Sequence, residues 1–346
     1  MKAEIKGTMG KIEELAQQLR AELENGHFQA GERFPSEYEL ARRYNVNNKT
    51  ANKATSLLVT EGFLHRGGRG EGTFVRQTSI FPKMTLGFIG PIDKPYYCAI
   101  LNAFQRAALS AGCLTAVIAP ALENLGATIA SLKYSCISGY VSCCYGLIED
   151  IDRPVIYLED SASNMVYPDY VTSNSLHGSQ MMMGELLKRG HHDIVFFNAT
   201  DNNQDRTTGF VNAMRDSGIA NIEERIFTLA CEDMEFHCVQ MLKKALHNFP
   251  HLTAIATNSD DIAEQVIKAM RILKIDWEGK ITITGFGKVQ GIYDRYPIAT
   301  IDQHPIILGV ETFNALVRKI NTGVTQQIKI EPELANTQFI FPTDKG

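Results

Sequence analysis

The fold of the first 76 residues is set by a stretch near its middle, Phe34-Pro-Ser-Glu-Tyr-Glu-Leu-Ala41. Ser36 followed three residues later by Glu39 has the spacing of a capping box. In this motif the serine hydroxyl accepts a hydrogen bond from the Glu39 amide, and the Glu39 carboxylate accepts one from the Ser36 amide. The pair predicts a helix that begins after Ser36 and turns Leu40 and Ala41 inward.

Two further helices are predicted around this one. Upstream, apolar residues recur at the spacing of one helix face, at Ile12, Leu15, Ala16, Leu19 and Leu23. Asn25-Gly26 is expected to end that helix. Downstream, after a break at 45–47, a third helix is expected to run to Glu61-Gly62, with Gly62 as its stop.

The third helix is expected to turn a polar face outward. Its apolar side can pack on the first two helices, which leaves outward the residues Asn48, Lys49, Asn52 and Lys53. Two short β runs follow at 63–65 and 73–75, and between them lie Arg66, Arg69 and several glycines. Three helices and a β-hairpin in this order predict a winged helix-turn-helix.

This arrangement favours binding to duplex DNA. Amide side chains at helix spacing can pair with adenine edges in the major groove, and lysines with phosphates or guanine. Arg66 and Arg69 would bring charge to the backbone on a narrow, glycine-rich wing. Two alternatives remain open. The glycines could cradle a phosphate, although such a loop needs a helix after it and a strand follows here. The polar helix face could also be merely solvated.

Four blocks of this region resemble the GntR-type DNA-binding domain: 11–20, 34–41, 53–58 and 70–75. The resemblance implies that the DNA contacts are made by Ser36, Glu37, Asn48, Lys49, Thr50, Asn52, Lys53 and Gly70. The family often has arginines where this chain has Asn48 and Asn52. Because arginine favours guanine and asparagine favours adenine, we expect an operator richer in A·T pairs and weaker phosphate binding.

Charge and composition limit what the rest of the chain can be. The 346 residues carry a formal net charge of −5, yet residues 1–76 hold 12 Lys or Arg against 10 Glu. A mildly basic head on an acidic body suits a protein that offers one end to a polyanion. No apolar run approaches the roughly 18–20 residues that span a bilayer, and the N-terminus has no signal-peptide pattern. We therefore expect a cytoplasmic protein without a membrane partner.

The seven cysteines predict neither disulfides nor a metal site. An odd number without a signal peptide favours reduced, mostly buried thiols. Cys143 and Cys144 lie in the apolar stretch 140–145, which predicts a strand and a place in the core for both. His191-His192 and the pair His237/Cys238 lack the paired spacing of a zinc site, so we expect no metal and no cofactor.

A domain boundary is predicted at 77–84, where a proline interrupts a stretch without helical periodicity. Residues 85–346 then alternate apolar strands with amphipathic helices, which predicts an α/β domain of parallel sheets with helices on both faces. Ligands bind such sheets at the carboxyl ends of the strands. Polar residues follow the predicted strands there, at Asp93, Tyr96-Tyr97, Glu159-Asp160, Asn174, Asn198, Asp205-Arg206, Ser259-Asp260 and Gln303. Carboxylates, amides and an arginine beside aromatic rings suit a polyhydroxylated ligand, although about half of the set could be ordinary loop residues.

Scattered blocks between 85 and 342, among them 92–97, 206–210, 258–263 and 299–303, resemble the effector domain of LacI-type regulators. That domain is similar to two-lobed periplasmic sugar-binding proteins. The resemblance implies ligand contacts at Tyr97, Glu159, Arg206, Ser259, Asp260 and Gln303. Gly287 and Glu159 stand where the family usually has aspartate, so the effector is expected to be an unusual sugar, or not a sugar.

A GntR-type head on a LacI-type body is the architecture of the arabinose repressor group. It implies a transcriptional regulator, a repressor, that binds a palindromic operator as a homodimer and is released or retuned by a small effector. The alternative is a pyridoxal-phosphate enzyme on the same head. Such a body would need more residues than the chain provides after position 84 and a recognisable lysine site, so we expect no enzyme. A sugar-binding protein without DNA binding is opposed by the head.

Overall fold

The computed structural model describes residues 10–24, 27–68, 70–76, 83–148, 151–159, 167–199, 204–230 and 232–343. The chain divides into two compact units, Met1–Lys83 and Met84–Gly346. They are called the head and the body below. Most of the predicted linker lies outside the described residues.

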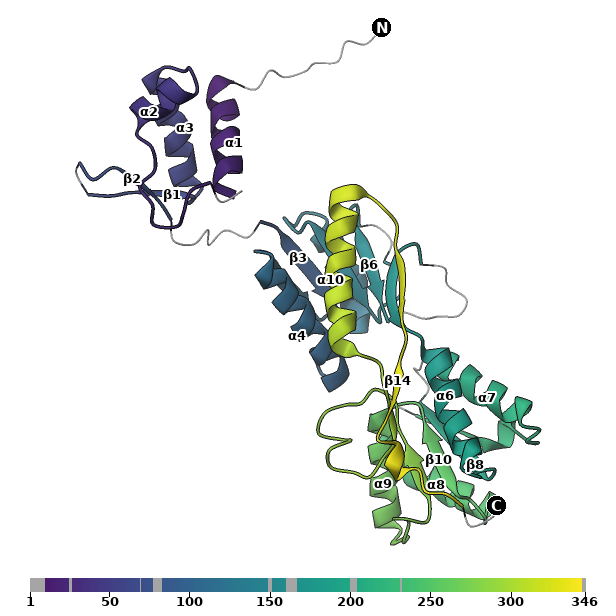
Figure 1. Cartoon of the computed structure of the whole chain (residues 1–346). Helices are drawn as coiled ribbons and strands as arrows, with labels where there is room; N and C mark the ends of the chain where they lie inside the picture. The colour runs from purple at the N-terminus through teal and green to yellow at the C-terminus, as the bar shows by residue number, and fades with distance from the viewer. Residues whose placement is uncertain are drawn as a thin grey trace. The chain divides into compact units, whose positions relative to one another are not determined.

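The head is a winged helix-turn-helix, as predicted (Figure 1). Its elements are α1 (Lys11–Glu24), α2 (Glu37–Arg43), α3 (Asn48–Thr60), β1 (Leu64–Arg66) and β2 (Thr73–Val75), and the two strands pair antiparallel. The Ser36–Glu39 capping box is present at the start of α2. Asn47 caps α3 by accepting a hydrogen bond from the Thr50 amide at 2.7 Å. The predicted stop at Asn25-Gly26 lies outside the described residues.

A small apolar core holds the three helices together. Leu19 of α1, Leu40 of α2 and Leu58 of α3 are fully buried and meet in one cluster with Leu64 of β1. Gly62 follows α3 with a φ of 85°, a conformation that side chains other than glycine rarely adopt, and it turns the chain into the hairpin. The helix spacing in the sequence therefore corresponds to the buried faces.

The first lobe of the body is built on a six-stranded parallel sheet of order β13-β7-β6-β5-β3-β4. Its strands are β3 (Thr85–Ile89), β4 (Leu114–Ile118), β5 (Gly139–Cys143), β6 (Val155–Leu158), β7 (Tyr170–Ser173) and β13 (Gln327–Ile330). Its helices are α4 (Pro95–Ser110), α5 (Leu125–Leu132) and α10 (Pro305–Thr322), with a 3-10 turn η1 (Leu122–Asn124). Phe88, Phe104 and Leu316 fill the core between the sheet and the helices α4 and α10.

The second lobe is built on a four-stranded parallel sheet of order β11-β10-β8-β9. Its strands are β8 (Ile194–Ala199), β9 (Ile226–Leu229), β10 (Ala254–Thr257) and β11 (Thr282–Thr284). The helices are α6 (Ser175–Lys188), α7 (Gln204–Asp216), α8 (Met234–Asn248) and α9 (Asp260–Ile272), with a 3-10 turn η2 (Glu223–Arg225). Separate clusters pack on each face of this sheet, around Val266 on one side and Phe210 on the other.

The chain crosses between the lobes after β7, after β12 (Thr300–Asp302) and after β13. β12 pairs antiparallel with β14 (Glu333–Ala335), which Figure 1 shows between the two sheets, and the 3-10 turn η3 (Thr337–Phe339) follows. The strands of both lobes are parallel, and their carboxyl ends therefore gather near these crossings. Among the described helices, none is both long and apolar enough to cross a membrane.

Candidate functional site

The head presents a polar surface along α2, α3 and the hairpin. The side chains predicted to contact DNA are mostly exposed, at Ser36, Asn48, Lys49, Asn52, Lys53, Arg66 and Gly70. Glu37 and Thr50 are half-buried, and Arg69 lies outside the described residues. Asn52 Nδ2 donates a 3.0 Å hydrogen bond to Glu37 Oε1, so the recognition surface joins α2 to α3. Arg66 donates to Ser56 Oγ at 2.9 Å, which holds the base of the hairpin against α3.

In the body, a hydrogen-bond network centred on Glu159 joins the two lobes. Glu159 follows β6 with a φ of 55°, a left-handed conformation that is uncommon outside glycine. Its Oε1 accepts from the Ser173 amide at 2.6 Å, and its Oε2 accepts from Tyr96 Oη at 3.1 Å and from Gln303 Nε2 at 3.2 Å. Burial raises the pKa of this carboxyl, while the Ser173 amide and the charge of Arg206 act in the opposite direction.

Arg206 of α7 brings the second lobe into this network. Its Nη2 donates to Gln303 Oε1 at 3.2 Å, and its Nη1 donates to the carbonyl oxygen of Asn258 at 2.5 Å. The guanidinium lies 4.0 Å from the centroid of the Phe286 ring, a cation–π distance. Gln303 therefore links Arg206 on one lobe to Glu159 on the other.

Two buried oxygens beside the network have no hydrogen-bond partner within the described part of the chain. Ser173 Oγ is at the end of β7, and Asn258 Oδ1 follows β10. Ser173 is 3% exposed and Asn258 is fully buried. A buried polar atom without a partner is costly, so native structures pair such atoms with protein, water or ligand. One unsatisfied oxygen therefore belongs to each lobe at the same junction.

The structure places the other residues predicted to bind ligand differently. Ser259 caps α9 by accepting from the Ile262 amide at 3.3 Å. Asp260 is fully buried and accepts hydrogen bonds of 2.6 Å from the Val289 amide and from Thr300 Oγ1. Burial raises the pKa of this carboxyl to about 6, partly offset by the Thr300 hydroxyl. Neither residue joins the hydrogen bonds around Glu159 described above.

Tyr96, the neighbour of the predicted Tyr97, is the tyrosine that donates to Glu159. The rings of the two tyrosines meet edge to face, with centroids 5.3 Å apart. Burial raises the pKa of Tyr97 well above its ordinary value, and the charges of Cys144 and Cys143 add to this effect. Asn258 was not predicted to contact ligand, although it directly precedes Ser259 in the block 258–263, which resembles the LacI-type effector domain.

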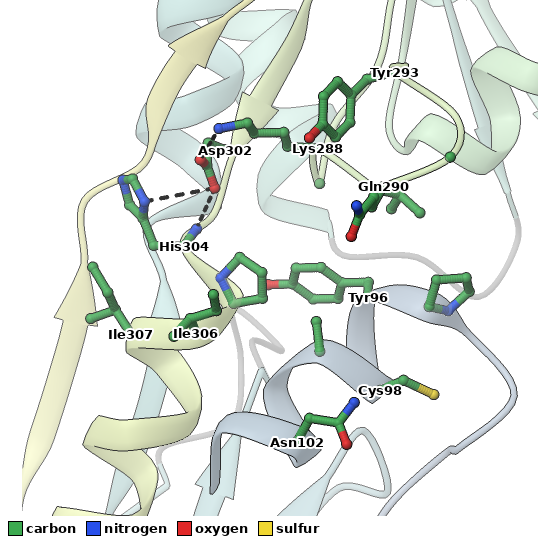
Figure 2. Close-up of a pocket in the computed structure, with 16 residues that line it drawn as sticks. Tyr96, Cys98, Asn102, Lys288, Gln290, Tyr293, Asp302, His304, Ile306 and Ile307 are labelled. Carbon is green, nitrogen blue, oxygen red and sulfur yellow. Dashed lines mark hydrogen bonds and ion pairs between the residues drawn. The ribbon is translucent and has the colours of Figure 1, made fainter. Parts of the chain in front are cut away.

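A cavity of about 810 Å³ opens beside Tyr96 (Figure 2). It is bounded by the first turns of α4, the first turn of α10 and the loop 287–291. Gly287 has a φ of 124°, and a Cβ there would lie 3.8 Å from Gln303 Oε1 and 4.0 Å from Tyr96. The wall of the cavity therefore has no side chain where the family usually has a carboxylate. On another wall, Asp302 pairs with Lys288 at 2.7 Å and lies 3.6 Å from His304, as Figure 2 shows.

The prediction that both adjacent cysteines belong to the core is wrong for one of them. Cys143 ends β5 and is fully buried, but Cys144 is exposed because the strand stops before it. Cys144 has a φ of 63°, so its side chain leaves the alternation of the strand. Of the other described cysteines, Cys113 and Cys238 are buried, Cys98 is half-buried and Cys136 is exposed.

Two family models match the chain, and together they cover most of it. Residues 11–75 match the bacterial regulatory proteins of the gntR family, and residues 83–340 match the periplasmic binding proteins and sugar binding domain of the LacI family. An arabinose metabolism transcriptional repressor of Halalkalibacterium halodurans is 22% identical over 92% of this chain and 93% of its own length.

Other relatives match one part or the fold. A probable fructoselysine utilization operon transcriptional repressor of Escherichia coli is 42% identical over 64 residues, which are 18% of this chain and 26% of that protein. A solved structure described as a transcriptional regulator CelR–cellobiose complex is similar in fold, with a TM-score of 0.63 and 14% identity over 87% of this chain and 98% of that one. The chain thus belongs to the family of periplasmic binding proteins and sugar binding domains of the LacI family, and with a head that matches the gntR family model it is a transcriptional regulator.

Proposed function

We propose that this regulator represses transcription by binding a palindromic operator as a homodimer, and that a small carbohydrate bound between the lobes of the body retunes this binding. The α3 helix would enter the major groove, with Asn48 and Asn52 near base edges and Lys49 and Lys53 near phosphates. The exposure of these four side chains supports this placement. The similarity to the Halalkalibacterium protein, a repressor of arabinose metabolism, supports the same function class.

The observation that carries the effector proposal is the network between the lobes. Glu159 offers a carboxylate from the first lobe, Arg206 a guanidinium from the second, and Gln303 an amide from the crossing between them. Ser173 Oγ and Asn258 Oδ1 add two acceptors that nothing in the described chain satisfies. Vicinal hydroxyls of a sugar can donate to the carboxylate and accept from the guanidinium at once. Their apolar C–H faces can stack on aromatic rings such as Tyr96.

The same network explains how a ligand could control the head. A ligand shifts an equilibrium only by its difference in affinity for the two states. Since the polar groups come from both lobes, a ligand that touches them all favours one arrangement of the lobes over others. The head directly precedes the first strand of the body in sequence, so paired heads would move when the lobes do. Two half-sites must fit groove positions about 34–36 Å apart, or multiples of that, so small displacements change operator affinity.

Exposed apolar residues at one edge of the first lobe support the homodimer. β4 is the last strand of the six-stranded order, and it exposes 47% of Leu114 and 39% of Val117. Leu109 at the end of α4 is 63% exposed on the adjoining helix. An apolar edge strand is a site of pairing with another chain unless something covers it. A second copy is the occupant that a palindromic operator requires, because operator symmetry mirrors protein symmetry.

The proposal gives the chain no catalytic activity and no cofactor, and it places the protein in the cytoplasm. A pyridoxal-phosphate enzyme would show the absorbance band of a lysine aldimine in the purified protein. We expect no such band, and its presence would favour the enzyme.

Two measurements on the purified full chain test the proposal. The first is fluorescence anisotropy with duplexes from upstream of its own coding region against bulk competitor DNA. We expect one fragment to be bound preferentially. The second is a thermal-shift screen with pentoses, hexoses and their acids, since a ligand stabilises the state that it binds. We expect at least one sugar to raise the melting temperature and to change the anisotropy. Equal binding of all duplexes, with and without sugars, would reject the proposal.

A further inference from the structure

Two thiols lie in contact at the ligand-facing edge of the first lobe. Cys143 and Cys144 follow one another at the carboxyl end of β5, and their Sγ atoms are 3.8 Å apart. β5 pairs with β3 and β6, so this strand end lies beside the one that carries Glu159. A Cβ added to Gly90, after β3, would lie 2.8 Å from Cys143 Cβ, so the backbone of Gly90 packs closely against Cys143.

The two thiols differ in the way that a redox pair requires. Cys144 is exposed and can meet a reagent from solvent, whereas Cys143 is fully buried and can be reached only through its neighbour. Redox-sensing cysteines are typically accessible and lie next to a second cysteine that resolves the first oxidation product. The left-handed backbone at Cys144 turns its side chain back toward Cys143, against the alternation of the strand.

We propose that Cys143 and Cys144 form a reversible dithiol–disulfide couple, oxidised by hydroperoxides, that changes the effector affinity of the cleft. The cleft is the proposed effector site around Glu159, Arg206 and Gln303 between the two lobes. The cleft's role rests on the proposed function, but the couple itself does not. The Cys144 thiolate attacks the peroxide oxygen, the O–O bond breaks, and a sulfenic acid forms while the leaving oxygen takes up a proton and departs as an alcohol, or as water when the oxidant is hydrogen peroxide. The Cys143 sulfur then attacks the sulfenic sulfur, and water leaves as the S–S bond forms. In total, two thiols and one hydroperoxide give one disulfide, water and an alcohol, or two waters from hydrogen peroxide.

Chain geometry makes such a disulfide easy to reverse. Consecutive Cα atoms are about 3.8 Å apart across a trans peptide, below the range of roughly 4.4–6.8 Å that disulfides usually span. A bond formed at this spacing is strained and more readily reduced than a structural disulfide. The pair is therefore suited to report a change in oxidants rather than to brace the fold.

Contacts lead from the thiols to the effector network. The Tyr97 ring meets that of Tyr96, which donates to Glu159, and Cys144 and Cys143 lie close enough to Tyr97 to help raise the pKa of its hydroxyl. Oxidation draws the Cys144 sulfur toward Cys143 and removes the thiol that Tyr97 faces. We expect the tyrosine pair to shift and the affinity for the effector to fall, with the reduced form as the tighter binder.

The first test uses the full chain without DNA or sugar. Hydrogen peroxide at limiting amounts is expected to remove two thiols together, to lower the mass by two hydrogens on the peptide that contains Cys143 and Cys144, and to be fully reversed by dithiothreitol. Phenylarsine oxide, which bridges two thiols, is expected to bind in one equivalent and to block the oxidation. Cys136 is the internal control, because it is exposed and would react as a single thiol.

Variants distinguish a paired reaction of Cys143 and Cys144 from the independent reaction of an exposed thiol. Cys144→Ser is expected to lose both the arsenical binding and the paired oxidation, whereas Cys136→Ser should keep both. Because Cys143 is buried, Cys143→Ala serves as the second variant, and its Cys144 is expected to stop at sulfenic or sulfinic acid. Oxidation of Cys144 to sulfinic acid in the wild-type chain, with Cys143 unchanged, would overturn the proposal. So would arsenical binding that survives Cys144→Ser.

The effect of the disulfide on effector binding is measured separately. In the thermal-shift screen, the stabilisation by an active sugar is expected to fall at least about threefold after oxidation and to return with dithiothreitol, and Cys144→Ser should remove this difference. If the disulfide forms and the sugar response is unchanged, the regulatory part is wrong while the couple stands. If no sugar is active, the proposed function fails and the thiol measurements still decide the couple.

Discussion

The head and the cleft of the body place polar groups in opposite ways. In the head, Asn52 and Glu37 meet in an exposed 3.0 Å hydrogen bond, and Lys49 and Lys53 are exposed on the same helix. In the cleft, burial raises the pKa of Glu159, and this carboxylate depends on partners that come from several elements. Exposed groups contribute to binding one by one, and salt screens them. Buried groups in a network act together, because losing one leaves the others unsatisfied.

This contrast teaches where each region is sensitive. Single changes in the head should weaken operator binding by degrees and alter its salt dependence. Single changes in the cleft should remove the effector response as a whole and leave the operator alone. The following predictions test that division.

The largest effect is expected from Arg206→Ala. The change removes the guanidinium that holds Gln303 and the Asn258 carbonyl. Loss of one partner in a buried charged network costs about 2–5 kcal/mol, so effector affinity should fall about 30-fold or more. Calorimetric titration of the active sugar measures the loss, and anisotropy should show unchanged operator affinity.

Arg215→Ala is the matched control for Arg206, because Arg215 lies on the same helix and is exposed. It should leave both affinities unchanged. An intact sugar response in Arg206→Ala would remove Arg206 from the effector site.

The next effect is expected from the double change Leu114→Glu and Val117→Glu on the edge strand β4. Two carboxylates in an apolar interface should raise the dimer dissociation constant by about 100-fold or more. Sedimentation velocity measures the oligomeric state, and operator affinity should fall with it. Val324→Glu, also at an exposed apolar position, is the control. A dimer that survives the double change would place the contact elsewhere.

A smaller effect is expected from Lys49→Ala. Loss of one phosphate contact should weaken operator binding uniformly across sequences and reduce the slope of log K against log salt by about 1. Anisotropy at several salt concentrations measures both quantities. Lys244→Ala, an exposed lysine of α8, should change neither. An unchanged slope for Lys49→Ala would show that this lysine does not touch the phosphates.

The last effect is on stability rather than on binding, and it is a pH dependence that comes from Asp260. Burial raises the pKa of this carboxyl to about 6, above its unfolded value of 3.8. The folded state therefore holds the proton more tightly, and its stability falls as the pH rises from about 4 to about 6. Relative to Asp260→Asn, the wild-type chain should lose on the order of 2–3 kcal/mol across that window. Chemical unfolding at several pH values measures it, and a constant difference would contradict the assignment.

The head could be predicted from the sequence because its signals are local. The Ser36–Glu39 capping box and the Gly62 stop each act within four residues, and the structure confirms both. These two signals and the apolar face of the first helix were enough to predict the winged helix-turn-helix. The Asn52–Glu37 bond was not predicted, because it joins residues of two helices.

The body's alternation of strands and helices was predicted, but some helix starts were not. α4 begins at Pro95 and α10 at Pro305, and neither start was located from the sequence, although Gly323 also follows the end of α10. Proline near the start and glycine after the end are signals that could have located both termini. His304, before α10, caps it with no side-chain hydrogen bond, so the usual capping pattern is absent there.

The cleft was predicted only in part, because its geometry depends on long-range packing. Gln303 hydrogen-bonds with both Glu159 and Arg206, as the prediction of a common site requires. Glu159 and Gln303 lie 144 positions apart in the sequence. The resemblance pointed to Tyr97, whereas Tyr96 is the tyrosine that donates to Glu159, because which of two adjacent helix residues faces the network depends on how the helix packs. The hydrogen bond that Asp260 accepts from Thr300 depends on a strand that lies 40 positions further along the chain.

The most direct test of the account measures the active sugar's affinity twice by calorimetry, with the free protein and with the protein saturated by operator. Linkage requires the operator to change sugar affinity by the same factor as the sugar changes operator affinity, and a coupling of about 1–3 kcal/mol corresponds to a factor of roughly 5 to 150. We predict equal factors within that range. Sugar affinity that is identical with and without operator would show that the cleft and the head act independently.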